Sequence, residues 1–297
     1  MNQNPRIALI ADRETLPEYT NSNTENAQLL SFLKEKGLDI TPEVWDNEKL
    51  NWSDYNILAL KTPWDYCLRI KEFHSWLDKL DRINAFLLNP IQIIRWNSDK
   101  IYFKDMEKEG IKLVPTLWLD QGNDFDVENI FEHFKTPKII VKPRVSGSAK
   151  HTYALTKEEA LQKREYIKGL IQEENFMTQP FLQEIQTQGE WSLIYFNGKY
   201  SHSVLKTAKS DDFRVQDNFG GNAHNLEAPS YLLEAAQNIV DKFAKGCLYA
   251  RVDGLDINQE FVLMELEIIE PQLFLTENKN AMEMYYQGLL EIIEKAS

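Results

Sequence analysis

The stretch Tyr249–Leu275, YARVDGLDINQEFVLMELEIIEPQLFL, restricts the fold of this chain more than any other segment. It contains two apolar, β-prone runs, Leu248–Leu255 and Phe261–Ile269, and the turn-forming sequence Asp256-Ile257-Asn258-Gln259 lies between them. This pattern predicts a β-hairpin. Alternation along the second strand predicts two faces, one with Val262, Met264, Leu266 and Ile268 and the other with Phe261, Leu263, Glu265 and Glu267.

The acidic residues of this hairpin are candidate metal ligands. Glu265 and Glu267 should point the same way, about 7 Å apart, and Asp253 brings a third carboxylate from the neighbouring strand, with Arg251 beside it. Three carboxylates on an apolar hairpin repel one another and resist burial. A hard cation such as Mg²⁺, bound through oxygen with nucleotide phosphates, would relieve both problems. A solvated strand face with ordinary surface glutamates fits the hairpin alone equally well.

Length, charge and cysteine content exclude several classes of protein. The 297 residues are 43% hydrophobic, enough for two or three domains. A net charge of −13 without a basic block argues against nucleic acid or an anionic membrane as partner. The chain shows no membrane span or signal peptide, and Cys67 and Cys247 have no disulfide or metal-ligand spacing. We expect a reduced, cytoplasmic protein, and a homo-oligomer stays open.

The first hundred residues predict an open α/β sheet, because three continuous apolar runs surround one amphipathic segment. The predicted strands are Arg6–Asp12, Ile40–Asp46 and Asn56–Lys61, and the helix is Thr24–Lys36, stopped by Gly37. The third strand runs into Trp64, Asp65 and Tyr66. Ligands of open sheets bind beyond the carboxyl ends of strands, so these three are candidate substrate residues. A packed turn, with Asp65 as a helix cap, explains the same segment.

The middle of the chain predicts a small α+β subdomain that carries two candidate lysines. Ser98 is expected to cap a helix that runs to Gly110 and has Lys100 at its start. Lys142 lies inside the predicted strand KIIVKP, where its ammonium needs an anion or solvent. The small residues that follow it could bring backbone N–H groups close to phosphate: Ser146, Gly147 and Ser148. Neither GxxxxGK[ST] nor GxGxxG occurs.

A second hairpin precedes a long polar loop. Trp191–Phe196 and Lys199–Lys206 flank Asn197-Gly198, which predicts a type I′ turn, and Lys206 ends the second strand. The segment Ser210–Asn225 has no periodicity and contains Arg214, Gln216, Gly220 and Gly221. A segment of this length in a compact protein is typically a binding loop.

These motifs, in this order, resemble the ATP-grasp superfamily of carboxylate–amine ligases from about Asn97 to the end. The phrases TPWDY, RWNSDK, VKPRVSGSAKHTY, GEWSL, SHSVLK, DFRVQ, YARVD and ELEIIEPQLFL are similar to a bacterial, glutathione-synthetase-like subgroup that includes a D-cycloserine-forming ligase. Two residues depart from the pattern. Glu267 replaces the Asn of the superfamily's Glu-x-Asn motif, as in the subgroup, and Trp191 stands where the subgroup often has Arg.

The resemblance implies an N-terminal α/β domain (residues 1–96) and an ATP-grasp module (97–297). The module would hold a nucleotide-clamping subdomain (about 113–178) and a C-terminal subdomain (179–297). It implies ATP contacts by Lys100, Lys142, the loop Ser146, Gly147 and Ser148, the backbone of Gln179, Phe181 and Leu182, and Glu190 at the ribose. Asp253, Glu265 and Glu267 would bind magnesium, and Lys206 and Arg251 would face the transferred phosphoryl group. The implied activity forms an acyl phosphate, which an amine displaces.

The sequence leaves the substrate and two other function classes open. Arg214 on its loop could grip a carboxylate, with Gln216, Gly220 and Gly221 beside it, and Asp65 between Trp64 and Tyr66 could receive an ammonium. We therefore predict a small amino-acid-like substrate. Arg214 could instead pair with acidic residues of its own loop. A nucleotide-binding module without ligase activity and a phosphotransferase with a hydroxyl acceptor are the alternative functions.

Overall fold

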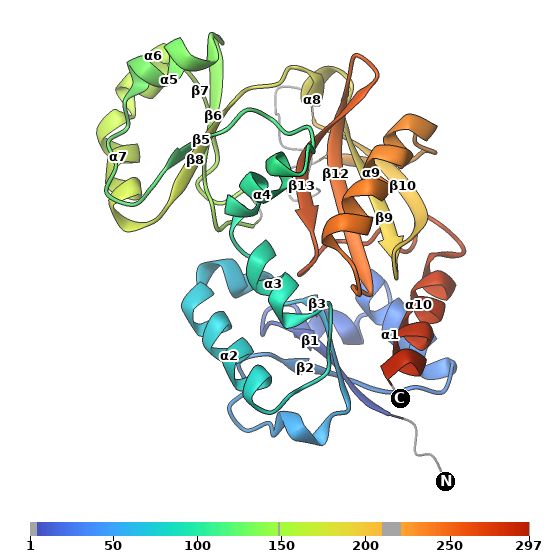
Figure 1. The fold of residues 1–297 in the computed structure, drawn as a ribbon. Coiled ribbons are helices and arrows are strands. Elements are labelled where there is room, and N and C mark those ends of the chain that lie inside the picture. Colours follow the sequence, from blue (N-terminus) through green and yellow to red (C-terminus); the bar gives the residue numbers. More distant parts are fainter. Residues whose placement is uncertain (1–4, 148, 210–220, 297) are drawn as a thin grey trace.

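The computed structural model describes residues 5–147, 149–209 and 221–296, and their strands form three separate sheets (Figure 1). In Figure 1 the first sheet lies at the bottom, the second at the upper left, and the third at the upper right. This is the mixed α/β and α+β architecture that the sequence predicts. No helix in the described ranges has the length and apolarity to cross a membrane.

The first sheet is parallel, with the order β2-β1-β3-β4. Its strands are β1 (Arg6–Ala11), β2 (Asp39–Val44), β3 (Ile57–Thr62) and β4 (Leu87–Leu88). The helices beside it are η1 (Leu16–Thr20), α1 (Glu25–Glu35), η2 (Trp52–Asp54), η3 (Trp64–Leu68) and α2 (Ile70–Arg82). Strand β3 is buried along its whole length, as its continuous apolar run predicts. Thr24 caps the N-terminus of α1, and Gly37, just after the C-terminal end of this helix, has φ +86°.

The connection to the second sheet differs from the predicted single helix. It contains α3 (Ile91–Asn97), η4 (Lys100–Tyr102) and α4 (Phe103–Lys108). The prediction that Ser98 is the cap is wrong, because Ser98 ends α3. Asp99 caps the following turn instead, where its Oδ1 accepts a hydrogen bond from Ile101 N at 2.9 Å. Ile91 and Ile94 are buried and pack α3 against the core of the first sheet.

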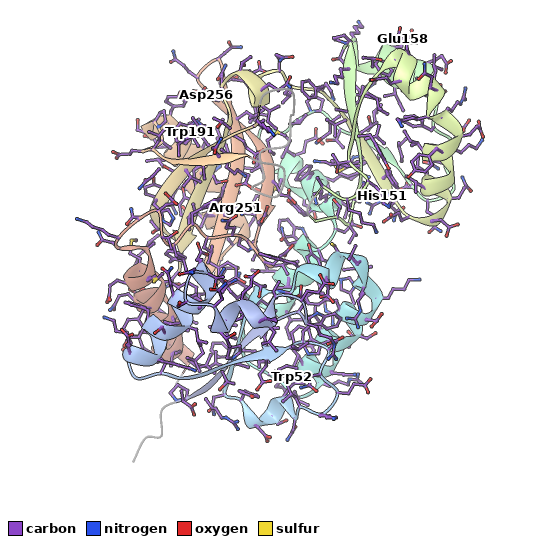
Figure 2. All side chains as sticks on the ribbon, turned by 180° about the vertical axis from the view of Figure 1, so that it is seen from behind. Trp52, His151, Glu158, Trp191, Arg251 and Asp256 are labelled. Atoms are coloured by element: carbon purple, nitrogen blue, oxygen red, sulfur yellow. The ribbon has the colours of Figure 1, made fainter. Side chains whose placement is uncertain are left out.

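The second sheet is antiparallel, with the order β5-β8-β6-β7. Its strands are β5 (Leu117–Leu119), β6 (Lys138–Pro143), β7 (Tyr153–Thr156) and β8 (Phe176–Pro180). Helices α5 (Val127–Phe134), α6 (Lys157–Gln162) and α7 (Arg164–Glu173) pack on it around a core of its own. Helices α6 and α7 meet at Lys163. Figure 2 shows His151 and Glu158 on this outlying unit.

The third sheet has the order β11-β10-β9-β12-β13. Its elements are α8 (Glu184–Thr187), β9 (Glu190–Phe196), β10 (Lys199–Thr207), β11 (Asn222–Asn225), α9 (Ser230–Phe243), β12 (Tyr249–Ile257), β13 (Glu260–Glu267) and α10 (Ala281–Ala296). Asn197 and Gly198 have φ +46° and +76°, so the predicted type I′ turn is confirmed. Asn258 and Gln259 also have positive φ, and they close the predicted hairpin of β12 and β13.

A β-bulge changes the predicted faces of β13. Asp253 pairs with Glu265, whereas the next residue, Gly254, pairs with Leu263, so Met264 is an extra residue without a partner opposite. The prediction that Leu263 shares the face of Glu265 and Glu267 is therefore wrong. Leu263 and Leu266 both join the core under α9, while Met264 joins the two glutamates at a cavity.

Candidate functional site

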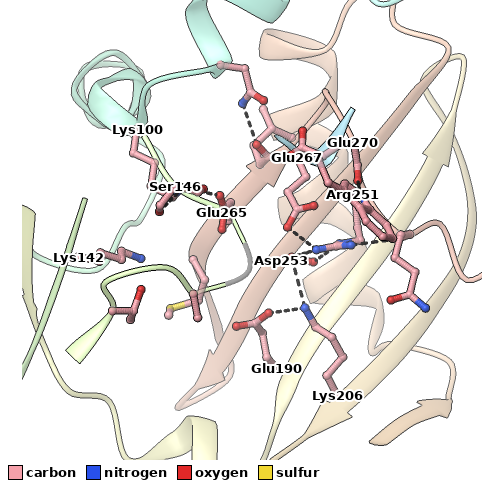
Figure 3. A pocket seen from close by; sticks show the side chains of 18 of the residues that line it. Lys100, Lys142, Ser146, Glu190, Lys206, Arg251, Asp253, Glu265, Glu267 and Glu270 are labelled. Carbon is pink, nitrogen blue, oxygen red and sulfur yellow. Dashed lines mark hydrogen bonds and ion pairs between the residues drawn. The ribbon is translucent and has the colours of Figure 1, made fainter. Parts of the chain in front are cut away.

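A cavity of about 510 Å³ lies where the three sheets meet, and all three parts of the chain line it (Figure 3). The described lining includes most of the predicted site residues, which are far apart in the sequence: Trp64, Tyr66, Lys100, Lys142, Ser146, Gly147, Gln179, Phe181, Leu182, Glu190, Lys206, Arg251, Asp253, Glu265 and Glu267. Strands β6, β8, β9, β10, β12 and β13 and the segments that follow β6 and β8 carry most of these side chains. The structure therefore brings most of the predicted residues to one cavity.

Arg251 and Asp253 form the buried centre of the charged wall. Asp253 is 2% exposed, and its Oδ2 lies 2.8 Å from Arg251 Nη2 and 3.3 Å from Lys206 Nζ, while its Oδ1 accepts from Ser192 Oγ at 2.5 Å. Burial raises the pKa of Asp253, but Arg251 and Lys206 outweigh it and lower the pKa to about 2. Asp253 is thus a fixed anion that positions two cations at the cavity.

The two cations of this wall reach further carboxylates. Arg251 also contacts Glu267 and donates from Nη1 to Gln272 O at 3.0 Å, and Figure 2 shows it within the third sheet. Lys206 Nζ lies 2.5 Å from Glu190 Oε1. Burial of Lys206 lowers the pKa of its ammonium, yet Asp253 and Glu190 raise it above the usual value. Both cations are therefore charged and held in place at neutral pH.

Lys100 and Lys142 approach the cavity from the opposite side (Figure 3). Lys100 Nζ lies 3.0 Å from Glu265 Oε1 and donates to Ser146 O at 3.0 Å. For Lys142, no hydrogen bond or ion pair joins its ammonium to any residue that the structure describes. Burial lowers the pKa of Lys142 to about 8, and Glu265 offsets this only in part. Among the residues that the structure describes, Lys142 is therefore a cavity cation without an ion-pair partner.

Two acidic residues of the cavity, Glu267 and Glu270, have raised pKa values. Burial and the neighbouring acids Asp253 and Glu265 raise the pKa of Glu267 to about 7, although Arg251 opposes this. Burial, and then Glu267, raises the pKa of Glu270 well above its usual value. Sequence reasoning missed Glu270. Its signal was the third acidic residue of the run ELEIIE, placed directly before Pro271.

The three predicted metal ligands do not form a metal cluster. Within the described ranges, no group of three or more His, Cys, Asp or Glu side chains could hold a metal ion. Asp253 is the reason, because Arg251, Lys206 and Ser192 occupy both of its carboxylate oxygens. Glu265 and Glu267 each share one oxygen with a cation, and the second oxygen of each has no partner among the described residues. The prediction that Asp253 binds the metal directly is therefore not supported by this geometry.

The remaining predicted residues lie in different places. Asp65 is not in the cavity lining: its Oδ1 accepts from Trp45 Nε1 at 2.7 Å, and its Oδ2 lies 3.0 Å from Arg69 Nη1. Its prediction as an ammonium receptor is corrected, because Trp45 and Arg69 engage both of its oxygens away from the cavity lining. Gly221 leads into β11 and does not appear in the described lining. Ser148, Arg214, Gln216 and Gly220 fall outside the described residues.

The first sheet contributes cavity residues that the sequence did not single out. They are Glu18 in η1, Glu25 and Asn26 at the start of α1, and Lys61 in β3. Lys61 is 2% exposed, and its Nζ lies 3.3 Å from Glu25 Oε1. A lysine in a continuous apolar strand was the available signal, the same one that identified Lys142.

Comparisons with known proteins agree with this architecture. Residues 7–89 match the family "D-cycloserine synthetase DcsG, N-terminal domain". The cycloserine biosynthesis protein DcsG of Streptomyces lavendulae is 24% identical over 305 residues, which cover 96% of this chain and 98% of that protein. The crystal structure of D-cycloserine synthetase DcsG is similar with a TM-score of 0.84 and 22% identity, over 96% of this chain and 98% of that one.

A second solved structure extends the likeness to another kind of enzyme. D-alanine–D-alanine ligase from Bacillus anthracis, complexed with ATP, has a TM-score of 0.71 and 18% identity, over 98% of this chain and 96% of that one. The similarity in both cases spans all three sheets, because nearly the whole chain is covered.

Proposed function

We propose that this chain, whose fold is that of the ATP-grasp ligases, is an ATP-dependent ligase that joins a small carboxylate to an amine. The observation that carries the proposal is the convergence of Lys100, Lys142, Lys206 and Arg251 on one cavity from different elements. Transfer of a phosphoryl group to a carboxylate needs cations around developing negative charge, and little covalent help from protein. These four side chains supply that environment.

Each cation has a role that its contacts support. Lys142, without a described counter-ion, and Lys100, at the Ser146 loop, would bind nucleotide phosphates. Lys206 and Arg251, fixed by Asp253, would face the transferred phosphoryl group and the acyl phosphate. Gln179, Phe181 and Leu182 line the cavity at the end of β8 and would contact adenine, with Glu190 toward the ribose.

Magnesium fits two residues of the cavity. Glu265 and Glu267 offer one unshared carboxylate oxygen each, and Mg²⁺ typically uses one or two carboxylates together with nucleotide phosphates. The ion would shield phosphate charge when it is bound. Asp253 would act on the site through Arg251 and Lys206.

We further propose the domain division 1–96 and 97–297, with 113–178 as the nucleotide-clamping part and 179–297 as the C-terminal part. Residues 1–96 contain the first sheet and residues 179–297 contain the third, and the second sheet lies within 113–178 except for the last two residues of β8. The substrate we propose is amino-acid-like, since the cavity wall carries both carboxylates and cations.

Product analysis tests the function. The protein is incubated with ATP, magnesium and a panel of amino acids and dipeptides, and ADP, phosphate and amide products are measured. A ligase gives all three in equal amounts, and Lys206→Met abolishes them. A phosphorylated product without free phosphate would indicate a phosphotransferase instead. ATP binding without any product would indicate a nucleotide-binding module.

A further inference from the structure

Helix η3 carries a cysteine that faces the loop after β6. Cys67 is the fourth residue of η3, is 9% exposed, and belongs to the core of the first sheet. A Cβ on Gly147 would lie 3.3 Å from Cys67 Sγ, so the Gly147 backbone lies against the sulfur. Cys67 itself does not appear in the described lining of the cavity, whereas Gly147 does.

The thiol of Cys67 uses both of its hydrogen-bonding functions. Its S–H donates to Trp64 O at 3.6 Å. Burial, and then Glu270, raises the pKa of this thiol, whereas a hydrogen bond from the backbone N–H of Gly147 lowers it. A thiol offers one weak donor and a weak acceptor, so Cys67 connects the backbone of η3 to the backbone of Gly147.

Helix η3 has a fixed position between the first and third sheets. Trp64 Nε1 donates to Glu270 O at 3.0 Å, which ties the start of η3 to the segment after β13. Tyr66 is buried in the same core as Ile269, the residue before Glu270. A group that contacts Cys67 is therefore placed relative to both sheets.

Residues 145–147 connect the outlying second sheet to this fixed part. Val145 packs against the core of the first sheet. Ser146 O accepts from Lys100 Nζ at 3.0 Å, and Gly147 contacts Cys67. Because the second sheet has a core of its own, contacts such as these decide how closely its cavity-facing loop approaches the other two sheets.

We propose that Cys67 is a positioning residue for nucleotide binding: its thiol holds the Gly147 backbone against η3 and thereby places residues 145–147 at the nucleotide phosphates. The inference rests on the proposed function, in which the loop after β6 contacts ATP, and it adds a residue outside the cavity to that site. Glycine is needed opposite the thiol, because any side chain there would press on the sulfur.

A double-mutant cycle between Cys67 and Gly147 tests the contact. Calorimetry measures the affinity of a non-hydrolysable ATP analogue, as its magnesium complex, for wild type, both single alanine variants and the double variant. Cys67→Ala should weaken binding by about 3- to 10-fold, as the loss of one hydrogen bond implies. Cys67→Ser keeps an acceptor and should restore part of the affinity.

The glycine variant gives the cycle its sign. Gly147 does not have a positive φ, so alanine adds no backbone strain there. Gly147→Ala should weaken binding by about 3-fold or more beside the intact thiol, because its methyl group presses on the sulfur. In the Cys67→Ala background the methyl group has room, so the same change should have little effect. Strictly additive effects would overturn the proposal.

The second cysteine of the chain supplies the matched control. Cys247 is 2% exposed in the core under α9 and is absent from the described cavity lining. Cys247→Ala removes the same atoms and should leave nucleotide affinity unchanged, while urea unfolding shows how far each variant loses stability. Equal nucleotide affinity in wild type and Cys67→Ala would mean that the contact positions nothing.

Thiol labelling gives a readout that a purely structural contact would not produce. With the loop held on η3, the bound analogue should slow alkylation of Cys67 by iodoacetamide by about 3-fold or more and leave the rate at Cys247 unchanged. Peptide mass spectrometry measures both rates. An equal or faster rate at Cys67 with nucleotide bound contradicts the proposal.

The two proposals fail in different ways. Coupling between Cys67 and Gly147 in nucleotide affinity, without ADP or amide product, would keep the positioning role and remove the ligase. Product formation without this coupling would keep the ligase and remove the role of Cys67. Failure of the wild-type protein to bind the analogue would remove both.

Discussion

At the scale of single residues, Lys142 is the cavity cation with the most pH-sensitive charge. Its pKa is lowered to about 8 by burial, and ATP phosphates would stabilise the ammonium and raise the pKa again. ATP binding should therefore take up a proton above pH 8, and ATP affinity should fall as pH rises through this range. Titration calorimetry at pH 9, in two buffers of different ionisation enthalpy, measures the uptake.

Two substitutions separate the charge of Lys142 from its shape. Lys142→Ala should weaken ATP binding by about 10- to 100-fold, the value of a charged hydrogen bond. Lys142→Arg should bind more tightly than Lys142→Ala and take up no proton, because a guanidinium does not titrate in this range. Equal ATP affinity in wild type and Lys142→Ala would show that Lys142 is only a strand residue.

Glu265 links a proposed phosphate-binding lysine to the proposed magnesium. Glu265→Gln preserves the shape of the side chain but removes the charge that pairs with Lys100. We expect turnover to be lost, roughly 100-fold or more, and ATP binding to become weak and nearly independent of magnesium. Measurements of ADP release and of ATP affinity with and without magnesium check this. Glu260→Gln, at the exposed end of the same strand, is the control, and full activity of Glu265→Gln would refute the role.

At the scale of elements, the hairpin of β12 and β13 depends on one glycine. A Cβ at Gly254 would lie 2.3 Å from Phe261 Cζ and 2.8 Å from Val262 O. Gly254→Ala should therefore destabilise the protein by about 1–3 kcal/mol, because the bulge and the core beneath it must shift. Urea unfolding measures the change. A Cβ at Gly169 in α7 would meet nothing within 4 Å. Gly169→Ala should therefore stabilise the protein by about 0.5–1 kcal/mol, because alanine favours a helix more than glycine does.

The same hairpin shows what the sequence can and cannot predict. Its strands, its turn and the direction of Glu265 and Glu267 follow from local pattern, and the structure confirms them. The bulge at Met264 does not follow, because it depends on how Gly254 lets Phe261 pack across the strand pair. One extra residue in a strand moves every later side chain to the opposite face of the sheet from the one that strict alternation predicts.

The candidate site shows the same limit. Lys142 is identified because a charge inside an apolar strand is conspicuous, and the structure brings it to the cavity. Lys61 carried the same signal, but the direction of its side chain depends on the bulge in the pairing of β1 with β3. Trp45, twenty residues away, occupies one oxygen of Asp65, and Arg69, only four residues on, holds the other. The Lys61 bulge and the Trp45 contact are tertiary and do not follow from local pattern, whereas the pairing of Asp65 with Arg69 is local.

At the scale of the whole molecule, the first and third sheets share one core. Ile7 and Leu9 of β1 belong to the same buried cluster as Tyr249 of β12 and Leu248 just before it, and Tyr285 of α10 joins them. In Figure 1, α10 lies beside α1, so the end of the chain returns to its beginning. The cavity lies between these joined sheets and the outlying second sheet, which has its own core.

Asn89 connects the two joined sheets through hydrogen bonds. It is fully buried, and its Nδ2 donates to Tyr249 O at 3.0 Å and to Ile268 O at 2.7 Å, while its Oδ1 accepts from Leu248 N at 2.7 Å. Asn89→Ala leaves these buried backbone groups unpaired, so we expect a loss of about 3 kcal/mol or more. Hydrogen exchange should show the first sheet opening separately from the third.

The backbone of Asn89 requires a control, because its φ of +67° is unfavourable for alanine. Asn84 has φ +50° at an exposed position, so Asn84→Ala carries the backbone cost without the buried hydrogen bonds and should lose only about 1 kcal/mol. Asn89→Gly relieves the backbone cost at the buried site itself. If Asn89→Gly is as stable as wild type, the hydrogen bonds do not hold the sheets together. If it loses most of what Asn89→Ala loses, the hydrogen bonds of this one buried amide hold the first sheet to the third.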